Sequence, residues 1–371
     1  MSNNKTISYI TYQTFPANTA NSLQTISNIK YLLKNNIDVT LVFPLRENNS
    51  SDDLQKINEH YGENLNINVE GTKHNYPFGK FDFFIRFFYI VSHFLWSRKV
   101  VKLIDLDKQN HSFFTRSDWV FYFLSKKNMP VIFECHQYTK LRKFIISLSL
   151  KSRNSKIIFL NENLKSDYEK KFTLNKNFLV LQNGVDLEIF KSEPKKRKQI
   201  IFVGRLTRFG EERGIKFIIS CFLNLNESYS LKVIGASKEE LKIYQDFVNK
   251  LKLESRVKIF GYENHKKVAK HISESDIGIL INSDSNKHSV KYTSPLKYFE
   301  YLSADVKIVA TDFDAHRKLP YSSNISFFNS DNSESFLNAI IQSEKRPLID
   351  AKEKEIISLD YRAKKIISII N

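Results

Sequence analysis

The stretch "SPLKYFEYL", residues Ser294 to Leu302, has the residue types of an anion-binding helix start. Pro295 suits the first helical position, and Ser294 has the short polar side chain of a helix cap. The amides of the first turn would then face a bound anion. Glu300 follows on the same helix, at about 1.5 Å per residue, a reach suited to ribose hydroxyls beside a phosphate, although a surface glutamate is the alternative.

Two arginines stand in a second stretch, "FVGRLTRFGEERGIKFI", where a strand ends at Val203 and a helix follows. Gly204 permits a tight turn, and Arg205 and Arg213 bracket the loop. A guanidinium group donates paired hydrogen bonds to a diphosphate, each stabilising by about 1.5 to 3 kcal/mol. Two solvated arginines are the alternative.

A histidine, His136, ends the strand-like segment "PVIFECH". A histidine in this position can be catalytic, or it can cap or pack within the structure. Its neighbour Cys135 would face the other side of an extended strand, and the chain has no G-x-S-x-G turn. A serine or cysteine hydrolase is therefore not indicated.

Strand-like runs alternate with stretches of helical period, which is typical of parallel sheets with crossover helices. The expected strands are ISYITYQ, DVTLVFP, HSFFTRS, PVIFECH, KIIFLN and NFLVLQN, and then QIIFVGRL, YSLKVIG, RVKIFGY, DIGILIN and VKIVATD. Helices are expected over Asn18 to Lys34 and from about Glu211 and Lys238. We predict an α/β fold of two doubly wound, Rossmann-like domains, residues 1–190 and 191–352, and a final helix in residues 353–371 that packs on the first.

Loops at the carboxyl ends of both sheets would then face each other across a cleft, where open α/β sheets bind ligands. The basic run "KSEPKKRKQ", residues Lys191 to Gln199, precedes a strand and is expected as an exposed connection between the domains.

The chain has 371 residues, a net charge of +17 and two cysteines, Cys135 and Cys221. The lysines are spread along the chain, so we expect solvated charge and no nucleic-acid partner. Two cysteines exclude a disulfide framework, and the N-terminus lacks a secretory signal pattern. We expect a cytoplasmic protein.

The most membrane-like stretch runs from Pro77 to Ile104, but its charge-free part, Phe87 to Ser97, is well short of the roughly 20 residues that span a bilayer. A helix on the inner, anionic membrane surface and a helix packed on a sheet with one wet edge are both open interpretations. The flanking basic residues are Lys80, Arg86, Arg98, Lys99 and Lys102.

The ordered set "FECHQYTK", "LQNGVDLEIF", "FVGRL" with its following "RG", and "SPLKYFEYLSADVKIVATD" resembles the retaining nucleotide-sugar glycosyltransferases of family 4, which have the GT-B fold. The motifs together cover most of the chain. The resemblance implies transfer of a sugar from a nucleoside diphosphate sugar to a hydroxyl of a glycan or lipid-linked acceptor, with retention and without a metal or cofactor. Surface polysaccharide synthesis is the expected pathway.

The resemblance also assigns roles. Arg205 matches a diphosphate-binding arginine, and Arg213 stands where the family more often has lysine. Glu300 matches the ribose-binding glutamate, and the amides around Ser294, Pro295 and Leu296 match the loop that holds the diphosphate.

Gly261 and Tyr262 match the segment beside the base, and His136 matches a histidine near the transferred sugar. The first strand-helix loop, Pro16 to Asn21, is expected on the acceptor side. The catalytic residues so expected are His136, Arg205, Arg213 and Glu300; the donor-binding residues are Gly204, Arg205, Arg213, Gly261, Tyr262, Ser294, Pro295, Leu296 and Glu300; and the acceptor-side residues are Pro16, Ala17 and Asn18.

The sequence departs from the family at two places. Tyr292 stands where many members have a second glutamate, and the first loop, "FPANTANS", lacks the paired glycines of many relatives.

Three other classes of protein are alternatives. A metal-dependent single-domain transferase would need an Asp-x-Asp pair, for which Asp105 with Asp107 and Asp312 with Asp314 are candidates, but it would not need a restarted strand-helix pattern. A dinucleotide oxidoreductase would need G-x-G-x-x-G after the first strand, which is missing. A non-catalytic nucleotide binder or membrane-surface scaffold of the same fold would hold nucleotide without consuming nucleotide-sugar.

Overall fold

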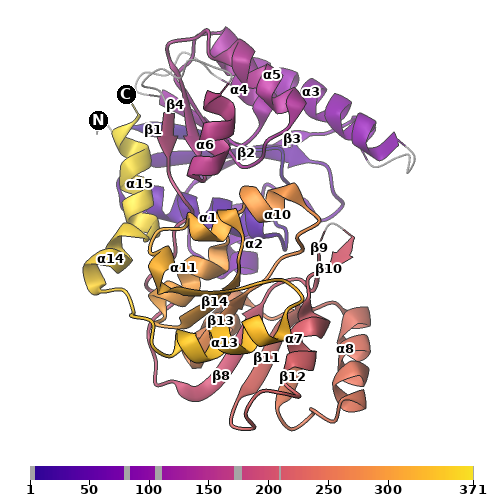
Figure 1. Ribbon diagram of the computed structural model, residues 1–371. Coiled ribbons are helices and arrows are strands. Elements are labelled where there is room, and N and C mark those ends of the chain that lie inside the picture. Colours follow the sequence, from indigo (N-terminus) through magenta and orange to yellow (C-terminus); the bar gives the residue numbers. More distant parts are fainter. Residues whose placement is uncertain (1–4, 79–83, 105–110, 171–177, 209, 371) are drawn as a thin grey trace. The chain divides into compact units, whose positions relative to one another are not determined.

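The computed structural model describes residues 5–78, 84–104, 111–170, 178–208 and 210–370. The chain forms two compact units (Figure 1). Unit 1 comprises Met1–Leu181 and Leu359–Asn371, and unit 2 comprises Gln182–Ser358. We expected the divisions after residues 190 and 352, whereas the structure divides the chain after Leu181 and after Ser358.

In its described residues, unit 1 has a seven-stranded parallel sheet in the order β3-β2-β1-β4-β5-β6-β7. Its strands are β1 (Thr6–Ile10), β2 (Asp38–Leu45), β3 (Asn68–Lys73), β4 (His111–Thr115), β5 (Val131–Cys135), β6 (Ser155–Phe159) and β7 (Phe178–Val180). In β1, Ile7 lies opposite Val39 on one side and Ser112 on the other. The order of the sheet therefore reverses between β1 and β4.

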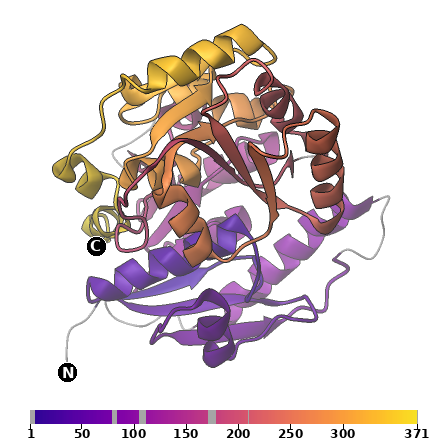
Figure 2. The same cartoon turned by 90° about the horizontal axis from the view of Figure 1, so that it is seen from below.

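Helices cover both faces of this sheet (Figures 1 and 2). They are α1 (Ala20–Lys34), α2 (Leu54–Tyr61), α3 (Ile85–Leu103), α4 (Asp118–Lys126), α5 (Lys140–Ser149), α6 (Glu162–Glu169) and α15 (Leu359–Ser368). Hydroxyl caps set several starts, because Thr19, Ser117 and Thr139 each accept a hydrogen bond from a first-turn amide.

In its described residues, unit 2 has a six-stranded parallel sheet in the order β12-β11-β8-β13-β14-β15 and a separate antiparallel hairpin. The strands are β8 (Lys196–Val203), β11 (Ser230–Ala236), β12 (Val257–Gly261), β13 (Ser275–Leu280), β14 (Lys307–Thr311) and β15 (Ile325–Phe328), with β9 (Thr207–Arg208) and β10 (Glu211–Glu212) in the hairpin. The helices are α7 (Ile215–Cys221), α8 (Lys238–Lys250), α9 (His265–Ser273), α10 (Lys287–Lys291), α11 (Leu296–Ser303), α12 (Asp314–Arg317), α13 (Ser333–Ser343) and α14 (Ala351–Ile356), with a 3-10 turn at Ser322–Asn324.

Each strand predicted from the sequence overlaps an observed strand, and in the described residues two strands of the main sheets were missed, besides the two short strands of the hairpin. The first, β3, reads "NVEGTK" and has one apolar residue besides its glycine, so it lacks the usual strand pattern. The second, β15, is a short buried run. The helix expected from Glu211 begins later, at Ile215, because Glu211 and Glu212 pair with the preceding strand.

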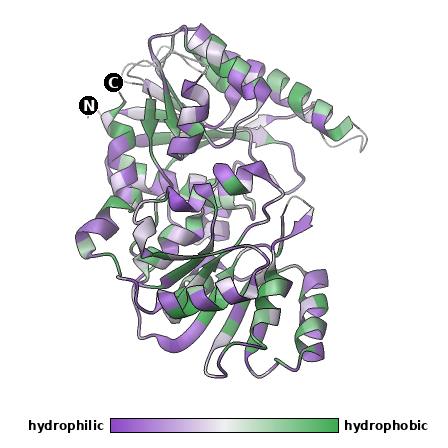
Figure 3. Ribbon diagram, in the orientation of Figure 1, coloured by the Kyte–Doolittle hydropathy of each residue, from purple (hydrophilic) through white to green (hydrophobic). Residues whose placement is uncertain are grey.

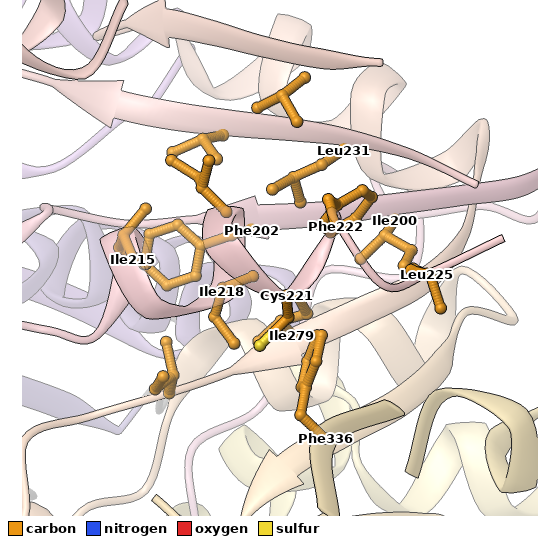
Figure 4. Packing of buried hydrophobic residues seen from close by; sticks show 14 of the residues in the cluster. Ile200, Phe202, Ile215, Ile218, Cys221, Phe222, Leu225, Leu231, Ile279 and Phe336 are labelled. Carbon is orange, nitrogen blue, oxygen red and sulfur yellow. The ribbon is translucent and has the colours of Figure 1, made fainter. Parts of the chain in front are cut away.

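The strand β8 is held by two cores, one on each face of the unit 2 sheet. Ile200 and Phe202 belong to one core, and Ile201 and Val203 belong to the other, as the alternation of a strand requires. Figure 4 shows Ile200 and Phe202 among the side chains of the first core. Each fully buried side chain of this size stabilises the fold by about 1.5 to 3 kcal/mol, so the loop after β8 starts from a fixed position.

The basic run expected to connect the domains lies inside unit 2. The preceding Phe190 is buried in a unit 2 core, and its carbonyl accepts a hydrogen bond from Ser303 at 2.6 Å. Lys195 donates to the carbonyl of Ser273 at 2.7 Å, and Lys196 pairs with Glu274 at 2.6 Å. These contacts place the run against unit 2.

The last helix, α15, belongs to unit 1, where it packs beside α1. Leu359, Ala363 and Ile366 join the unit 1 core. Between them Arg362 is 1% exposed, which is unusual for an arginine and requires internal partners.

The helix α3 carries the aromatic residues that suggested a membrane surface, and Figure 3 shows hydrophobic residues along it. Phe84, Ile85 and Phe87 are exposed near its start, whereas Trp96 and Val100 are buried. Within the described ranges, no helix combines the length and the hydropathy that a membrane crossing needs.

Candidate functional site

The carboxyl edge of the unit 2 sheet collects most of the predicted residues. Here β8 lies between β11 and β13, where the strand order reverses, and open α/β sheets bind ligands outside such a point. Gly204, Arg205 and Arg213 follow β8, Gly261 and Tyr262 stand at the end of β12, and Ser294, Pro295, Leu296 and Glu300 lie between β13 and β14.

Arg213 carries a half-buried positive charge with only neutral acceptors. Its Nη2 donates to the carbonyl of Ile281 at 2.6 Å and to Oδ1 of Asn282 at 2.8 Å, and its Nη1 donates to the carbonyl of Arg205 at 3.1 Å. Its Nε is buried and finds no acceptor, and no carboxylate pairs with it, among the described residues. Burial, and then the charge of Arg208, lower the pKa of Arg213 to about 10. A guanidinium held in this way is prepared for an anionic ligand.

Arg205 has an exposed side chain, while its carbonyl is fixed by Arg213. Burial and then the charge of Arg205 lower the pKa of Arg208, so these two cations are also close. The loop after β8 therefore gathers three guanidinium groups. Arg208 was not predicted, although it stands between the two arginines that were.

The carboxylate next to Arg213 raises its pKa, but less than burial lowers it, and the carboxylate oxygens are bound by other groups. Glu212 accepts from the amides of Gly214 at 2.8 Å and Ile215 at 2.6 Å, at the start of α7, and from the hydroxyl of Tyr244 at 2.8 Å. The start of α7 thus already holds an anion supplied by the chain itself.

The start of α11 has no such side chain. Its N-cap residue is Pro295, without a side-chain cap, and the hydroxyl of Ser294 is buried with no partner in the described part of the chain. The prediction that Ser294 caps the helix and that Pro295 is its first residue is wrong, because the helix begins one residue later, at Leu296. Asn183 donates to the carbonyl of Ser294 at 2.7 Å and so holds the turn. The first amides of α11 stay available to an anion.

Glu300 is 6% exposed, so the alternative of a surface glutamate is wrong. Its Oε2 accepts from Nζ of Lys297, one turn earlier, at 2.5 Å. Burial, then Glu300, raise the pKa of the neighbouring Tyr301, and the charge of Arg213 acts in the opposite direction. The buried part of α11 and the cation of Arg213 therefore lie within electrostatic reach of each other.

Two glycines shape the loop after β8. A Cβ at Gly204 would lie 2.8 Å from Nη1 of Arg213, and a Cβ at Gly235 would lie 2.4 Å from the carbonyl oxygen of Gly204. The amide of Gly204 donates to the carbonyl of Ile234 at 2.9 Å. Sequence reasoning missed Gly235, although a glycine inside a strand pattern is a signal of close backbone approach.

Gly261 ends β12, and the side chain of the following Tyr262 is 66% exposed. An exposed ring directly after a strand, at the carboxyl edge, is free to stack on a planar ligand.

On unit 1, the predicted acceptor-side loop follows β1, beside the point where that sheet reverses. The Phe15–Pro16 peptide bond is cis. The amide of Ala17 donates to the hydroxyl of Tyr61 at 2.9 Å, whereas Asn18 is exposed. The loop is therefore anchored by a hydrogen bond at Ala17, and Asn18 is exposed to solvent.

His136 follows β5 and has a partner on each ring nitrogen. Nη2 of Arg116 lies 3.0 Å from Nδ1, and Nε2 bonds to Oε1 of Glu134. Burial, and then Arg116, lower the pKa of His136 to about 4, although Glu134 acts to raise it. The ring is therefore neutral at neutral pH.

Arg116 is a site residue that sequence reasoning missed. It directly follows β4, and its Nη2 also reaches Oδ1 of Asn21 at 3.1 Å and Oε1 of Gln24 at 3.2 Å on α1. It thus joins the loops at the reversal of the sheet to His136. The available signal was an arginine at the end of the predicted strand "HSFFTRS".

Of the two Asp-x-Asp pairs that were metal-site candidates, the structure describes one, and both of its carboxylates form ion pairs with basic side chains. Asp312 pairs with Arg317, whose Nη2 lies 2.5 Å from Oδ2, and Asp314 pairs with Lys318 at 3.5 Å. Asp105 and Asp107 lie outside the described residues. Elsewhere in the described ranges, no three His, Cys, Asp or Glu side chains are grouped to hold a metal ion.

Comparison with protein families gives one match. Residues 197–344, which include the donor-side residues named above, match the model described as Glycosyl transferases group 1. No curated protein matched the chain.

Solved structures match over nearly the whole length. Sucrose-phosphate synthase from Thermosynechococcus elongatus is similar at 13% identity with a TM-score of 0.71, covering 99% of this chain and 98% of that one. A glycosyltransferase from Rickettsia africae is similar at 16% identity with a TM-score of 0.69, covering 99% and 98%. A mutant of S. aureus TarM, in complex with fondaparinux, α-GlcNAc-glycerol and UDP, is similar at 12% identity with a TM-score of 0.68, covering 99% and 100%.

These matches and the two parallel sheets confirm the predicted fold class. The chain has the GT-B fold, with two Rossmann-like α/β domains.

Proposed function

We propose that this protein is a glycosyltransferase that moves a sugar from a nucleoside diphosphate sugar to a hydroxyl of a glycan or lipid-linked acceptor. The observation that carries the proposal is Arg213, a half-buried cation whose hydrogen-bond acceptors among the described residues are all neutral. It lies in electrostatic reach of a helix whose start has no side-chain cap. A diphosphate would supply an anionic hydrogen-bond acceptor for this guanidinium. The match of residues 197–344 to a glycosyltransferase family supports the same assignment.

The donor site would use the unit 2 residues in distinct roles. Arg205, Arg213 and the amides at Leu296 bind the diphosphate and stabilise the charge that develops on it as the glycosidic bond breaks. Glu300 receives a ribose hydroxyl, and Tyr262 lies beside the base. No metal or cofactor is included in this proposal.

We place the acceptor on unit 1, near the loop of Pro16, Ala17 and Asn18, and we propose retention of configuration. The acceptor hydroxyl attacks the face of the anomeric carbon from which the diphosphate leaves. The carbon–oxygen bond to the phosphate breaks, the new glycosidic bond forms, and a leaving phosphate oxygen takes the hydroxyl proton. His136 orients the sugar.

Calorimetric titration with UDP, GDP and ADP in excess EDTA tests the donor site. UDP is the first ligand to use, since the TarM mutant was solved with it. We expect one nucleotide to bind without metal, and Arg205→Ala and Glu300→Ala to weaken it by about 10- to 150-fold, the value of one charge-assisted hydrogen bond. Lys250→Ala, an exposed cation on α8, is the matched control. Binding of no nucleotide, or equal binding by all variants, would overturn the assignment.

Turnover separates the enzyme from a non-catalytic binder of the same fold. The binder is an alternative because Tyr292 stands where many relatives have a carboxylate. Tyr292 is 3% exposed, and its ring lies near the ammonium groups of Lys287 and Lys291. Consumption of a nucleotide-sugar, dependent on acceptor, supports the transferase. Tight nucleotide binding without any consumption would favour the binder.

An anionic membrane surface is the proposed location of a lipid-linked acceptor. Phe84 and Phe87 are 55% and 59% exposed, and Arg86 lies between them. Co-sedimentation with vesicles of anionic lipid should decrease for Phe84→Ser with Phe87→Ser. Leu223→Ser, at an exposed apolar residue of unit 2, is the control, and binding unchanged in the double variant would exclude this surface.

A further inference from the structure

Glu134, at the end of β5, is a buried carboxylate with partners from three elements. Its side chain is 0% exposed. Oε1 bonds to Nε2 of His136 and lies 3.6 Å from Nε of Arg116, while Oε2 accepts from Nη2 of Arg362 on α15. Burial acts to raise the pKa of Glu134, but Arg362 first, and then His136 and Arg116, hold it below its ordinary value. The carboxylate is therefore charged.

Arg362 is turned entirely toward the protein interior. Its Nη1 donates to the carbonyl of Leu181 at 2.9 Å, and its Nε donates to Oδ1 of Asn28 at 3.3 Å. Each donor group of this guanidinium thus has a protein acceptor, and the side chain has no surface for substrate. Its contact with the site passes through Glu134.

The hydrogen bonds define one tautomer of His136. A guanidinium can only donate, so Nδ1 of His136 accepts from Arg116 through its lone pair. The ring proton must then be on Nε2, where the Glu134 carboxylate accepts it. A protonated ring would direct a second N–H at the guanidinium.

We propose that Glu134 and Arg362 are positioning residues, which hold His136 in its neutral Nε2–H form, so that the last helix of the chain completes the acceptor-side site. The role of Glu134 and Arg362 in sugar transfer rests on the proposed function. The effect of Arg362 on the tautomer and pKa of His136 does not depend on that function. A neutral, oriented imidazole can contact a sugar without placing another positive charge beside the anomeric carbon as it becomes cationic.

The charges around His136 give the direction of the test. Burial lowers the pKa of His136 most and Arg116 lowers it next, while Glu134 raises it and Arg362 is the smallest of the lowering causes. The buried hydroxyl of Tyr9 also interacts with this carboxylate, and burial, then Glu134, raise its pKa. Loss of the Arg362 charge, while Glu134 stays ionised, should therefore raise the pKa of His136 above about 4.

Nitrogen-15 NMR of the histidine rings in the full-length, ligand-free chain measures both tautomer and titration. In the wild type we expect the Nε2–H tautomer and a midpoint near 4. In Arg362→Met we expect a higher midpoint and mixed tautomers, together with a loss of kcat at little changed nucleotide affinity. Arg362→Lys should restore the wild-type midpoint. Lys364→Met, which removes a 64% exposed cation from the same helix, should change neither.

An unchanged midpoint and tautomer in folded Arg362→Met would overturn the proposal. If that variant does not fold, the same NMR measurement on Arg362→Gln decides the proposal. This variant removes the charge but keeps a donor for the carbonyl of Leu181. A wild-type chain without transferase activity, but with an Arg362-dependent His136, would overturn the proposed function and support the coupling.

Discussion

A methyl group on Gly204 would lie 2.8 Å from Nη1 of Arg213, so the guanidinium occupies the space that a side chain at this glycine would take. Gly204→Ala should displace the guanidinium, which is the movable partner, and because Gly204 has φ +155° the new side chain should also strain the backbone at this turn. We expect nucleotide affinity to fall by about 10-fold or more, since one charge-assisted contact is lost, and unit 2 to lose about 1 kcal/mol of stability from the strained backbone.

A double-mutant cycle checks the cause of this effect. In an Arg213→Gln background, Gly204→Ala should change nucleotide affinity little, because the side chain that it displaces is absent. Additive losses would show that the glycine acts through the backbone instead.

The second close approach, between Gly235 and the carbonyl of Gly204, predicts a loss of stability. The oxygen that a Cβ would meet at 2.4 Å belongs to the backbone, and Gly235 has φ +118°. Neither can move cheaply, so Gly235→Ala should destabilise unit 2 by about 1 to 3 kcal/mol or more. Hydrogen exchange of β8 and β11 measures this loss. Gly210→Ala, at φ +84° with no atom near its Cβ, controls for conformational strain alone, and equal effects of the two variants would contradict the prediction.

The strand-helix alternation placed the expected donor-side residues at or after the ends of β8, β12 and β13, and their role in donor binding stays a prediction. Arg205, Arg213 and Glu300 needed only the strand-helix alternation to be placed at one edge of a sheet. Arg116 follows β4 and could have been placed in the same way. The charge of Arg362 could not, since its partner is distant in sequence: Arg362 and Glu134 are 228 positions apart. The cap of α11 was placed one residue too early because Ser-Pro fits two registers of a helix start equally well.

His136→Ala separates catalysis from donor binding. The histidine belongs to unit 1, and the nucleotide contacts proposed above belong to unit 2, so nucleotide affinity should stay within about 2-fold of wild type. Transfer should fall by about 10²-fold or more, in the range of a lost catalytic contact. Full activity would return His136 to a structural role.

The acid stability of unit 1 should depend on His93, which is 7% exposed. Its ring stacks on Tyr12 at a centroid distance of 4.3 Å, and its Nε2 lies 2.6 Å from Oγ of Ser117. Burial lowers the pKa of His93 to about 4, against the opposing charge of Asp118. The unfolded chain, with an ordinary histidine pKa near 6.5, then binds more protons than the folded chain between these values.

This contribution is complete above pH 6.5 and is lost as the pH falls toward 4, to an extent of at most about 3 kcal/mol. Trp96 and Trp119, the two tryptophans of the chain, both belong to unit 1, so denaturant unfolding followed by their fluorescence reports on it. His93→Gln should reduce the slope of stability against pH between 6.5 and 4.5. His60→Gln, at an exposed ring, should leave the slope unchanged. The prediction is wrong if the slope of unfolding free energy against pH is the same in wild type and His93→Gln. The ring would then become protonated in the folded protein without loss of stability, and its stacking on Tyr12 would tolerate the charge.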